Sequence, residues 1–384
     1  MTASRLSLSL KRFQRWFTDD AMPLWVARGY DKARGGFYET LDFSGAPVDG
    51  QPRRVRVQAR QIYTFSHAAL RGWRDGAEAL AAEGFEYFLA RACPDGGARG
   101  CVHLLSDDGD IIDNRRDLYD QAFLLLACAA RWRAAKDGRA LDLADRTIAF
   151  MDHELASPHG GWLESDRRET PRRQNPHMHL FEAFLALLDA TGDDRFRQRA
   201  EQVFALFQSV FHDRDRGVVW EFFNDGWDRA GQPETIEPGH MFEWVWLLNK
   251  YEQATGADYE DMREALFSRT AALASDAAHH GFVANRVSLD GREQTKDKRL
   301  WPQTEYLKAC LVQFRRGDAA AGERARSLIE ALFETYLNTQ TPGLWTDEYD
   351  GAGAPAARDV PASILYHLFE AVAETAETAK TVDA

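Results

Sequence analysis

A glycine followed by a bulky residue and a short alternating run recurs six times along this chain of 384 residues. The gaps between successive glycines are 61, 64, 56, 64 and 62 residues. The six positions are Gly36, Gly97, Gly161, Gly217, Gly281 and Gly343. A near-even period of this length is typical of one supersecondary unit used repeatedly, each copy burying its apolar face against its neighbours. The spacing therefore predicts six copies of one unit in a single domain over residues 1–384.

Each unit reads as two helices followed by a long hairpin that carries the glycine. Apolar residues recur at three- and four-residue steps in the helical stretches, as in Phe181, Phe184 and Leu188. The hairpins contain the turn pairs Ser44-Gly45, Asp108-Gly109 and Asp290-Gly291. The predicted helices are 6–28, 54–74, 76–92, 117–136, 139–156, 176–191, 194–211, 240–255, 258–279, 302–316, 319–338 and 362–378.

Twelve helices in six pairs predict an all-α fold. None of the pairs can bury its apolar face alone, so the pairs are expected to close into an (α/α)6 barrel. In that arrangement inner helices surround a central cavity, outer helices cover them, and the β-hairpin loops gather at one end. An open helical solenoid is the structural alternative.

Charge and composition exclude several classes of partner. The formal net charge is −13 and the sequence pI about 5.4, and an acidic surface repels nucleic acid. No apolar run approaches the roughly 20 residues that span a bilayer, and the first residues lack the apolar core of a signal peptide. We therefore expect a cytoplasmic monomer or homodimer with no nucleic-acid or membrane partner. Cys93, Cys101, Cys128 and Cys310 lack CxxC spacing and are interpreted as reduced thiols, a Cys93–Cys101 disulfide being the alternative.

Polar and aromatic residues recur where each hairpin leads into the next helix. Those junctions should all lie at one end of the ring. Residues found there, 14 to 26 positions after the preceding glycine, are Arg60, Tyr119, Asn175, His179, His240, Glu243, Trp301, Glu305 and His367. A concave site with a few converging polar groups is the default location for function, so these residues form the candidate site.

Three motifs in a fixed order carry a family resemblance: Asn175-x-x-x-His179, Gly239-His240-x-x-Glu243-Trp244 and Tyr366-His367. Together they resemble the N-acylglucosamine 2-epimerase superfamily, which includes 2-epimerases of free and N-acylated sugars, cellobiose 2-epimerase, and mannose- and sulfoquinovose-type aldose–ketose isomerases. The resemblance spans residues 5–375. It implies an (α/α)6 barrel that acts without a cofactor at C1 and C2 of a reducing sugar, with His240 and His367 as the acid/base pair.

The chemistry of histidine supports this assignment independently. Moving a proton at the carbon beside a carbonyl needs a base of near-neutral pKa and a group that protonates the enediol, and histidine suits both roles. His240 and His367 come from distant repeats, so they can stand on opposite sides of one sugar. Glu243 lies one helical turn beyond His240 and can orient its imidazole or bind a hydroxyl. His179, the third expected catalytic histidine, is assigned to ring opening or to hydroxyl binding.

The remaining candidates are assigned to the substrate monosaccharide. Arg60 is expected to donate to sugar oxygens or to the enediolate. The other expected substrate-binding residues are Tyr119, Asn175, Trp301, Gln303, Glu305 and Trp345, with core packing as the alternative for the aromatic ones. The arginine runs 53–56, 115–116, 167–168 and 172–173 are interpreted as loop charge, or alternatively as a rim for a phosphate or sulfonate. HExxH and paired aspartates at metal-ligand spacing are absent, so no metal is expected.

The favoured reaction is interconversion of D-mannose and D-fructose through a cis-enediol. Segments 174–179 and 361–363 look most like mannose isomerases, and Ala362-Ser363 stand where cellobiose-type members carry a tryptophan. The alternatives are a 2-epimerase (mannose/glucose or N-acylglucosamine type) and a mannose-6-phosphate isomerase. A glycoside hydrolase using Glu243 and Glu305 as paired carboxylates, and a non-catalytic sugar-binding ring, are less favoured.

Overall fold

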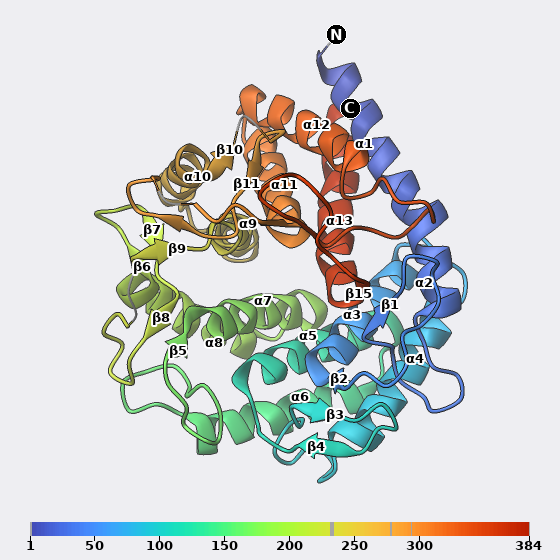
Figure 1. Ribbon diagram of the computed structural model, residues 1–384. Helices are drawn as coiled ribbons and strands as arrows, with labels where there is room; N and C mark the ends of the chain where they lie inside the picture. Colours follow the sequence, from blue (N-terminus) through green and yellow to red (C-terminus); the bar gives the residue numbers. More distant parts are fainter. Residues whose placement is uncertain (1, 231–233, 277–278, 293, 384) are drawn as a thin grey trace.

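The computed structural model describes residues 2–230, 234–276, 279–292 and 294–383 (Figure 1). The α-helices are α1 (Thr2–Arg15), α2 (Met22–Arg28), α3 (Val55–Leu70), α4 (Ala77–Tyr87), α5 (Leu118–Ala135), α6 (Gly138–Phe150), α7 (Gln174–Thr191), α8 (Asp194–Leu206), α9 (Pro238–Thr255), α10 (Glu260–Ala274), α11 (Leu300–Arg315), α12 (Ala319–Glu334) and α13 (Ser363–Asp383). Single π-helical turns continue the outer layer at η1 (Trp16–Ala21), η2 (Phe88–Ala92), η3 (Met151–Leu155) and η4 (Phe207–Phe211).

The helices form a closed ring of two layers. Going round the inner layer, α3 contacts α5, α5 contacts α7, and the series continues through α9, α11 and α13 back to α3. Each inner helix also packs on an outer one: α4, α6, α8, α10, α12, and the continuous helix formed by α1, η1 and α2. The contact between α13 and α3 excludes the open solenoid, so the predicted (α/α)6 barrel is confirmed (Figure 1).

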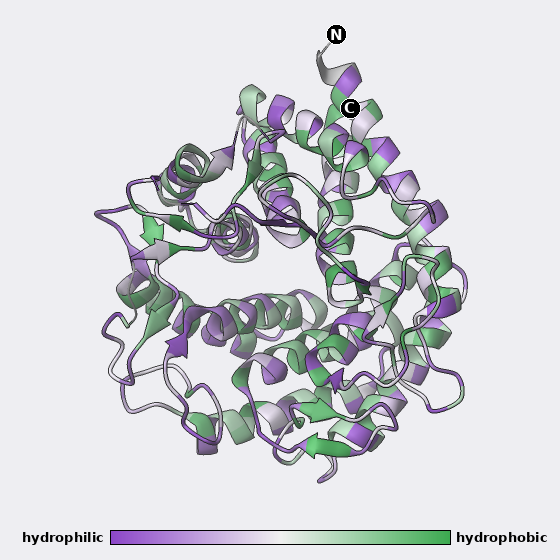
Figure 2. Ribbon diagram, viewed as in Figure 1, coloured by the Kyte–Doolittle hydropathy of each residue, from purple (hydrophilic) through white to green (hydrophobic). Residues whose placement is uncertain are grey.

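Amphipathic outer helices explain this layering. Along α1, apolar and hydrophilic residues alternate in patches (Figure 2), and Leu6, Leu10 and Phe13 are buried while Lys11 is exposed. This spacing of three and four residues places one apolar stripe against α13. Within the described ranges, no helix combines the length and apolarity needed to cross a bilayer. The four cysteines are buried as free thiols.

Local signals fix most of the helix ends. The Asp117 carboxylate caps α5 by accepting the Tyr119 N–H at 3.0 Å, and Gly192 ends α7 in the left-handed region at φ 70°. The ninth predicted helix, 258–279, instead ends at Ala274, because Ser275 is extended and pairs with the next strand; residues 277–278 of that prediction lie outside the described residues. The eleventh, 319–338, ends at Glu334.

Short strands tie the loops of neighbouring repeats into a belt at one end of the ring. They are β1 (Thr40–Leu41), β2 (Arg53–Arg54), β3 (Leu104–Leu105), β4 (Ile111–Asp113), β5 (Arg172–Arg173), β6 (His212–Asp213), β7 (Val218–Val219), β8 (Phe222–Phe223), β9 (Thr235–Ile236), β10 (Ser275–Asp276), β11 (Phe282–Val283), β12 (Val287–Ser288), β13 (Lys298–Arg299), β14 (Glu348–Tyr349) and β15 (Val360–Pro361). The predicted local hairpins exist as β3–β4, β6–β7 and β10–β11, but five further pairs join different repeats.

One of these pairs closes the circle. Strand β1 of the first repeat pairs with β15 of the last, Thr40 opposite Pro361 and Leu41 opposite Val360. The inner helices begin directly after these loops, so their first turns all lie at the belted end (Figure 1). This end carries the candidate site.

Candidate active site

His240 lies in the first turn of α9 between two carboxylates. Its Nδ1 is 3.0 Å from Glu221 Oε2 and 3.4 Å from Glu237 Oε2. Burial by itself lowers the pKa of an imidazole, but these carboxylates outweigh it and raise the pKa of His240 to about 10. His240 is therefore an imidazolium at neutral pH.

The second ring nitrogen of His240 lies next to the side-chain amide of Asn175. Nε2 lies 3.1 Å from Asn175 Nδ2 at the start of α7, and Asn175 Oδ1 is buried without a hydrogen bond. Turning the amide over lets Oδ1 accept a hydrogen bond from the imidazolium Nε2–H, which satisfies both groups; oxygen and nitrogen of a side-chain amide are assigned by this kind of network. Asn175 thus fixes the ring that carries the charge.

His367, in α13, has the opposite protonation state. Its Nδ1 lies 2.9 Å from Glu305 Oε1, while Glu305 Oε2 is 2.6 Å from the buried ammonium of Lys308. Burial lowers the pKa of His367 to about 3, and the charges of Arg60 and Lys308 act in the same direction. Because Lys308 compensates Glu305, that carboxylate orients the imidazole without protonating it. His367 is therefore a neutral base with Nε2 free to accept a proton.

A single indole separates these two histidines. The Trp301 ring centroid is 5.0 Å from that of His240 and 5.7 Å from that of His367, and Trp301 is half-buried at the belted end. A Cβ on Gly239 would lie 2.4 Å from the Trp301 ring, so only glycine lets the indole lie against the start of α9. An acid and a base thus flank one aromatic surface suited to a sugar ring.

His179 and Arg60 are two further basic residues of the candidate site. His179 Nδ1 is 2.9 Å from Glu182 Oε2 in α7, and burial together with Arg60 and His240 holds the pKa of His179 well below its usual value. Arg60 donates to the Tyr119 hydroxyl at 2.9 Å and lies 4.2 Å over the Phe123 ring. Its side chain is 6% exposed, and among the described residues it forms no ion pair with a carboxylate. Arg60 therefore has an unused capacity for an anion.

Glu243 supplies a buried carboxyl group between the histidines. It is fully buried, both of its oxygens lack a hydrogen bond, and Oε1 lies 3.9 Å from His179 Nε2. Burial and the neighbouring Glu305 raise the pKa of Glu243 well above its usual value. A neutral carboxyl of this kind can donate a hydrogen bond as well as accept one.

Nine of the expected site residues are thus brought together in what we call the histidine cluster: Arg60, Tyr119, Asn175, His179, His240, Glu243, Trp301, Glu305 and His367. Gln303 and Trp345 lie elsewhere. The Gln303 amide accepts the Val283 N–H at 2.8 Å and donates to the Val283 carbonyl at 3.0 Å. Trp345 is buried in a stack with Trp25 of the outer layer, at 5.0 Å between centroids.

Gln303 belongs to a repeated anchoring device. Gln58 and Gln121 bind the backbone of Phe37 and Cys101 in the same two-way manner, and in the third repeat His177 Nε2 accepts the Trp162 N–H at 3.1 Å. Each anchor fastens an inner helix to the segment that follows its repeat glycine. This explains why His177, two residues from His179, serves packing.

Three residues that contact the histidine cluster were not singled out by sequence reasoning: Glu182, Glu221 and Lys308. Tyr366, whose hydroxyl donates to Glu182, entered only as part of the Tyr366-His367 motif. Glu221 follows Gly217 by four residues, and Glu39 and Glu164 follow their own repeat glycines by three. A glutamate that recurs three or four residues after the repeat glycine was a sequence signal from which Glu221 could have been identified. The signal for Lys308 was weaker: it lies three residues after Glu305 and therefore on the same helix face.

Most residues of the arginine runs form ion pairs, whereas Arg172 donates to the backbone carbonyls of Asp225 and Trp162. Strands β2, β5 and β13 each consist of one pair of residues and directly precede α3, α7 and α11. The second residue of each pair binds a carboxylate: Arg54 binds Glu39, Arg173 binds Glu164, and Arg299 binds Asp347 at 3.2 Å. The first residue of each pair, Arg53, Arg172 or Lys298, is buried.

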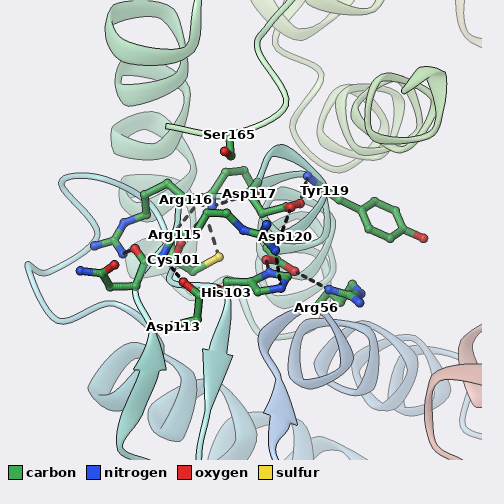
Figure 3. A network of polar contacts seen from close by, with 12 residues as sticks. Arg56, Cys101, His103, Asp113, Arg115, Arg116, Asp117, Tyr119, Asp120 and Ser165 are labelled. Carbon is green, nitrogen blue, oxygen red and sulfur yellow. Dashed lines mark hydrogen bonds and ion pairs between the residues drawn. The ribbon is translucent and has the colours of Figure 1, made fainter. Parts of the chain in front are cut away.

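A further network surrounds the start of α5 (Figure 3). His103 Nδ1 lies 2.6 Å from Asp120, its Nε2 lies 2.6 Å from Arg115, and Arg56 pairs with Asp120 at 3.4 Å. The Tyr119 ring points away from this network (Figure 3). The network positions Tyr119 and hence Arg60.

Three groups in the described part of the chain have ligand atoms within 4.8 Å of one another, as a metal ion requires: His103 with Asp117 and Asp120, His179 with Glu182 and Glu243, and His240 with Glu221 and Glu237. In the first group both ring nitrogens of His103 are already engaged, by Asp120 and Arg115. The expectation of a metal-free protein stays a prediction, for which EDTA treatment is the test.

Comparisons with known proteins agree with the fold and identify the family. The family model for N-acylglucosamine 2-epimerase matches residues 36–371. The chain is 34% identical to a mannose-6-phosphate isomerase of Rhizobium meliloti over 95% of this chain and 96% of that protein. It is 30% identical to a D-mannose isomerase of Thermobifida fusca over 82% of each. The solved structure of cellobiose 2-epimerase from Spirochaeta thermophila superposes with a TM-score of 0.88 at 22% identity, covering 99% of this chain and 98% of that one. The chain therefore belongs to the N-acylglucosamine 2-epimerase family and is an enzyme of the sugar isomerase and epimerase class.

Proposed function

We propose that this enzyme interconverts D-mannose and D-fructose without a cofactor, by proton transfer through a cis-enediol. The observation that carries the proposal is the pair of histidines with opposite protonation states, the imidazolium of His240 and the neutral imidazole of His367, on either side of Trp301. Aldose–ketose isomerisation needs one base for carbon and one acid for oxygen. This pair supplies one of each.

The proton movements balance over one turnover. In the open-chain aldose, His367 Nε2 removes the C2 proton while His240 donates a proton to O1, which gives the enediol. His240 then takes the proton of O2, and His367 returns its own proton to C1, which gives the ketose. Arg60 and the neutral Glu243 stabilise charge on the enediolate oxygens, and His179, held by Glu182, assists the opening of the pyranose ring.

A free sugar is favoured over a sugar phosphate. Arg54, Arg56 and Arg173, at the starts of α3 and α7, are each paired with a carboxylate, whereas Arg60 is buried within the cluster. A phosphate would have to displace an ion pair at this end of the ring. Mannose 6-phosphate remains the second candidate substrate, because the relative at 34% identity is named a mannose-6-phosphate isomerase.

The test is incubation with D-mannose, D-glucose and mannose 6-phosphate in deuterated water, followed by NMR. We expect fructose from mannose, with solvent deuterium entering at C1 of the product in those turnovers in which the proton on His367 exchanges with solvent before it is returned. Turnover of mannose 6-phosphate alone would move the assignment to the phosphorylated substrate. Glucose formed from mannose without fructose would establish a 2-epimerase, and no change in any sugar would refute the proposal.

A further inference from the structure

A second cavity, of about 560 Å³, lies at the opposite end of the ring from the histidine cluster. It is lined by the C-terminal halves of α3, α5, α7 and α9 and by the middle of α13, and none of His179, His240 and His367 reaches it. On α9 the lining begins at Trp246, beyond His240 and Glu243; on α13 it begins at Phe369, beyond His367. We call this the rear cavity.

Glu370 is the feature of the rear cavity that packing leaves unexplained. It is 5% exposed, and its Oε1 accepts the Tyr63 hydroxyl. Within the described part of the chain no basic group lies within 4 Å of it. One turn further along α13, Glu374 is 2.9 Å from Lys250, 2.5 Å from Arg315 and 2.8 Å from the Trp246 indole nitrogen. Glu374 is in direct contact with basic side chains, and Glu370 is not.

The charges at the rim are already matched. Arg133 pairs with Asp189, and Arg71 lies 3.2 Å from Glu377. The inner helices end at this side of the ring, so their carbonyl ends add partial negative charge to it. Lys308 and Lys250 act on Glu370 only from beyond 4 Å, and Glu182 opposes them. Among the described residues Glu370 therefore has no direct cationic contact, which an occupant with a positive charge would supply.

The apolar part of the wall is aromatic and aliphatic and includes Tyr63, Phe369, Leu126, Leu185 and Leu247. The polar part includes the basic residues Arg71, Arg133 and Lys250, each paired with a carboxylate. Aromatic faces attract organic cations, and apolar walls favour a hydrocarbon body. A bare metal ion fits poorly, because Glu370 belongs to none of the three metal-like groups found among the described residues.

We propose that the rear cavity binds a small organic cation, with its ammonium group on Glu370 and its apolar body against Tyr63 and Phe369. The volume lies within the range of about 300 to 1,000 Å³ usual for small-molecule sites. This site is additional to the proposed isomerase function and independent of it. Glu182 lines the rear cavity and also binds His179, so the two sites share one wall.

The test is isothermal titration of the full chain with three ligands of one shape: benzylammonium, benzyl alcohol and benzoate. We expect saturable one-to-one binding of benzylammonium, at least about tenfold tighter than benzyl alcohol, which corresponds to about 1.4 kcal/mol, and no binding of benzoate. Glu370→Gln should weaken benzylammonium binding at least about tenfold. The matched control is Glu377→Gln, which changes a rim carboxylate already paired with Arg71 and should leave binding within about twofold.

Two further measurements guard against misfolding of Glu370→Gln and against binding of benzylammonium at the histidine cluster. Ala186→Trp fills the cavity from its half-buried wall and should abolish binding even if Glu370→Gln fails to fold. Saturating mannose should leave benzylammonium binding unchanged, since the sites lie at opposite ends of the ring. The proposal is overturned if benzylammonium does not bind, if benzyl alcohol binds equally well, if neither variant weakens binding, or if mannose competes. Because the readout is binding, failure of mannose turnover leaves it standing.

Discussion

Replacing Glu221 by glutamine should move the pH range over which the enzyme works. The change keeps the size of the side chain and an acceptor oxygen for His240 Nδ1, now 3.0 Å from Glu221 Oε2, but removes one of the two neighbouring negative charges. An opposite charge within about 4–6 Å shifts a pKa by about one to three pH units. The pKa of His240, about 10 with both carboxylates present, should therefore fall to between about 7 and 9.

The assay is the pH dependence of kcat/KM, which reports the free enzyme. If the imidazolium of His240 is the acid, activity is lost as pH rises through its pKa, so the alkaline limb should move from near pH 10 to between about 7 and 9 in Glu221→Gln. Glu237→Gln is the matched control. Glu237 lies farther from His240, at 3.4 Å, and also pairs with Arg286 at 3.3 Å. It should shift the limb less.

The free energy of unfolding should depend on pH in the same direction as the activity. The pKa of His240 is raised in the folded state from 6.5 to about 10, so its contribution is fully present below pH 6.5 and is lost as pH rises toward 10. Burial raises the pKa of Glu221 as well, so its replacement also removes a buried carboxyl, and the net loss of stability at pH 6 is smaller than the change in the His240 pKa alone implies. Urea unfolding at pH 6 and pH 9.5 should show a smaller difference between wild type and Glu221→Gln at the higher pH. An alkaline limb that stays in place, or that moves further in Glu237→Gln, would refute the assignment of His240 as the acid.

Three other perturbations test the cluster. His240→Ala and His367→Ala should each fold normally and lose about 10²- to 10⁴-fold in turnover, while exposed His159→Ala should match wild type; near-normal rates in both cluster variants would remove the mechanism. Gly239→Ala must displace Trp301, because the new Cβ would lie 2.4 Å from its ring, and should lower kcat/KM by about 10- to 100-fold; Gly138→Ala, with open space around it, should not. Activity should survive exhaustive EDTA treatment, and loss of activity restored by a divalent metal would show that one of the histidine–carboxylate groups holds an ion.

The barrel could be predicted from the sequence because the repeat is both periodic and local. Each unit carries its own apolar spacing and its own glycine, so the inner helices were placed within a few residues, as with 117–136 against α5 (Leu118–Ala135). The pairing of strands between repeats was not predicted. Two-residue strands such as β1 and β15 carry no periodic signal, and their partners lie more than 300 residues apart.

The candidate site was predictable in its residue types and not in its charges. A common offset after the repeat glycines identified His240 and His367, but their protonation states depend on tertiary partners. Glu221 reaches His240 across a loop of 19 residues, and Lys308 neutralises Glu305 from one turn further along α11. Gln303 and Trp345 share the offset or the residue type of the cluster, yet face Val283 and Trp25. Sequence spacing fixes which helix end a residue occupies and leaves its direction open.

The asymmetry between the two histidines bears on the choice between isomerase and epimerase. Isomerisation leaves both groups as they began, because His367 returns its proton to C1 and His240 recovers a proton from O2. Epimerisation at C2 ends differently: His367 keeps a proton from one face and His240 loses one to the other. With pKa values of about 3 and about 10, that end state lies on the order of 10 kcal/mol above the starting one.

We therefore expect mannose to yield fructose first, with glucose late or absent. Glu221→Gln lowers the pKa of His240 and so reduces the free-energy difference between the start and end states of epimerisation. It should therefore raise the ratio of glucose to fructose among the products. Product ratios in both enzymes, followed by NMR from the first minutes of reaction, provide the measurement. If glucose accumulates from mannose before fructose in the wild type, the pKa difference does not control the outcome and the enzyme is a 2-epimerase. If the ratio stays the same in Glu221→Gln, the preference for the ketose arises from the geometry of the bound enediol rather than from the charge on His240.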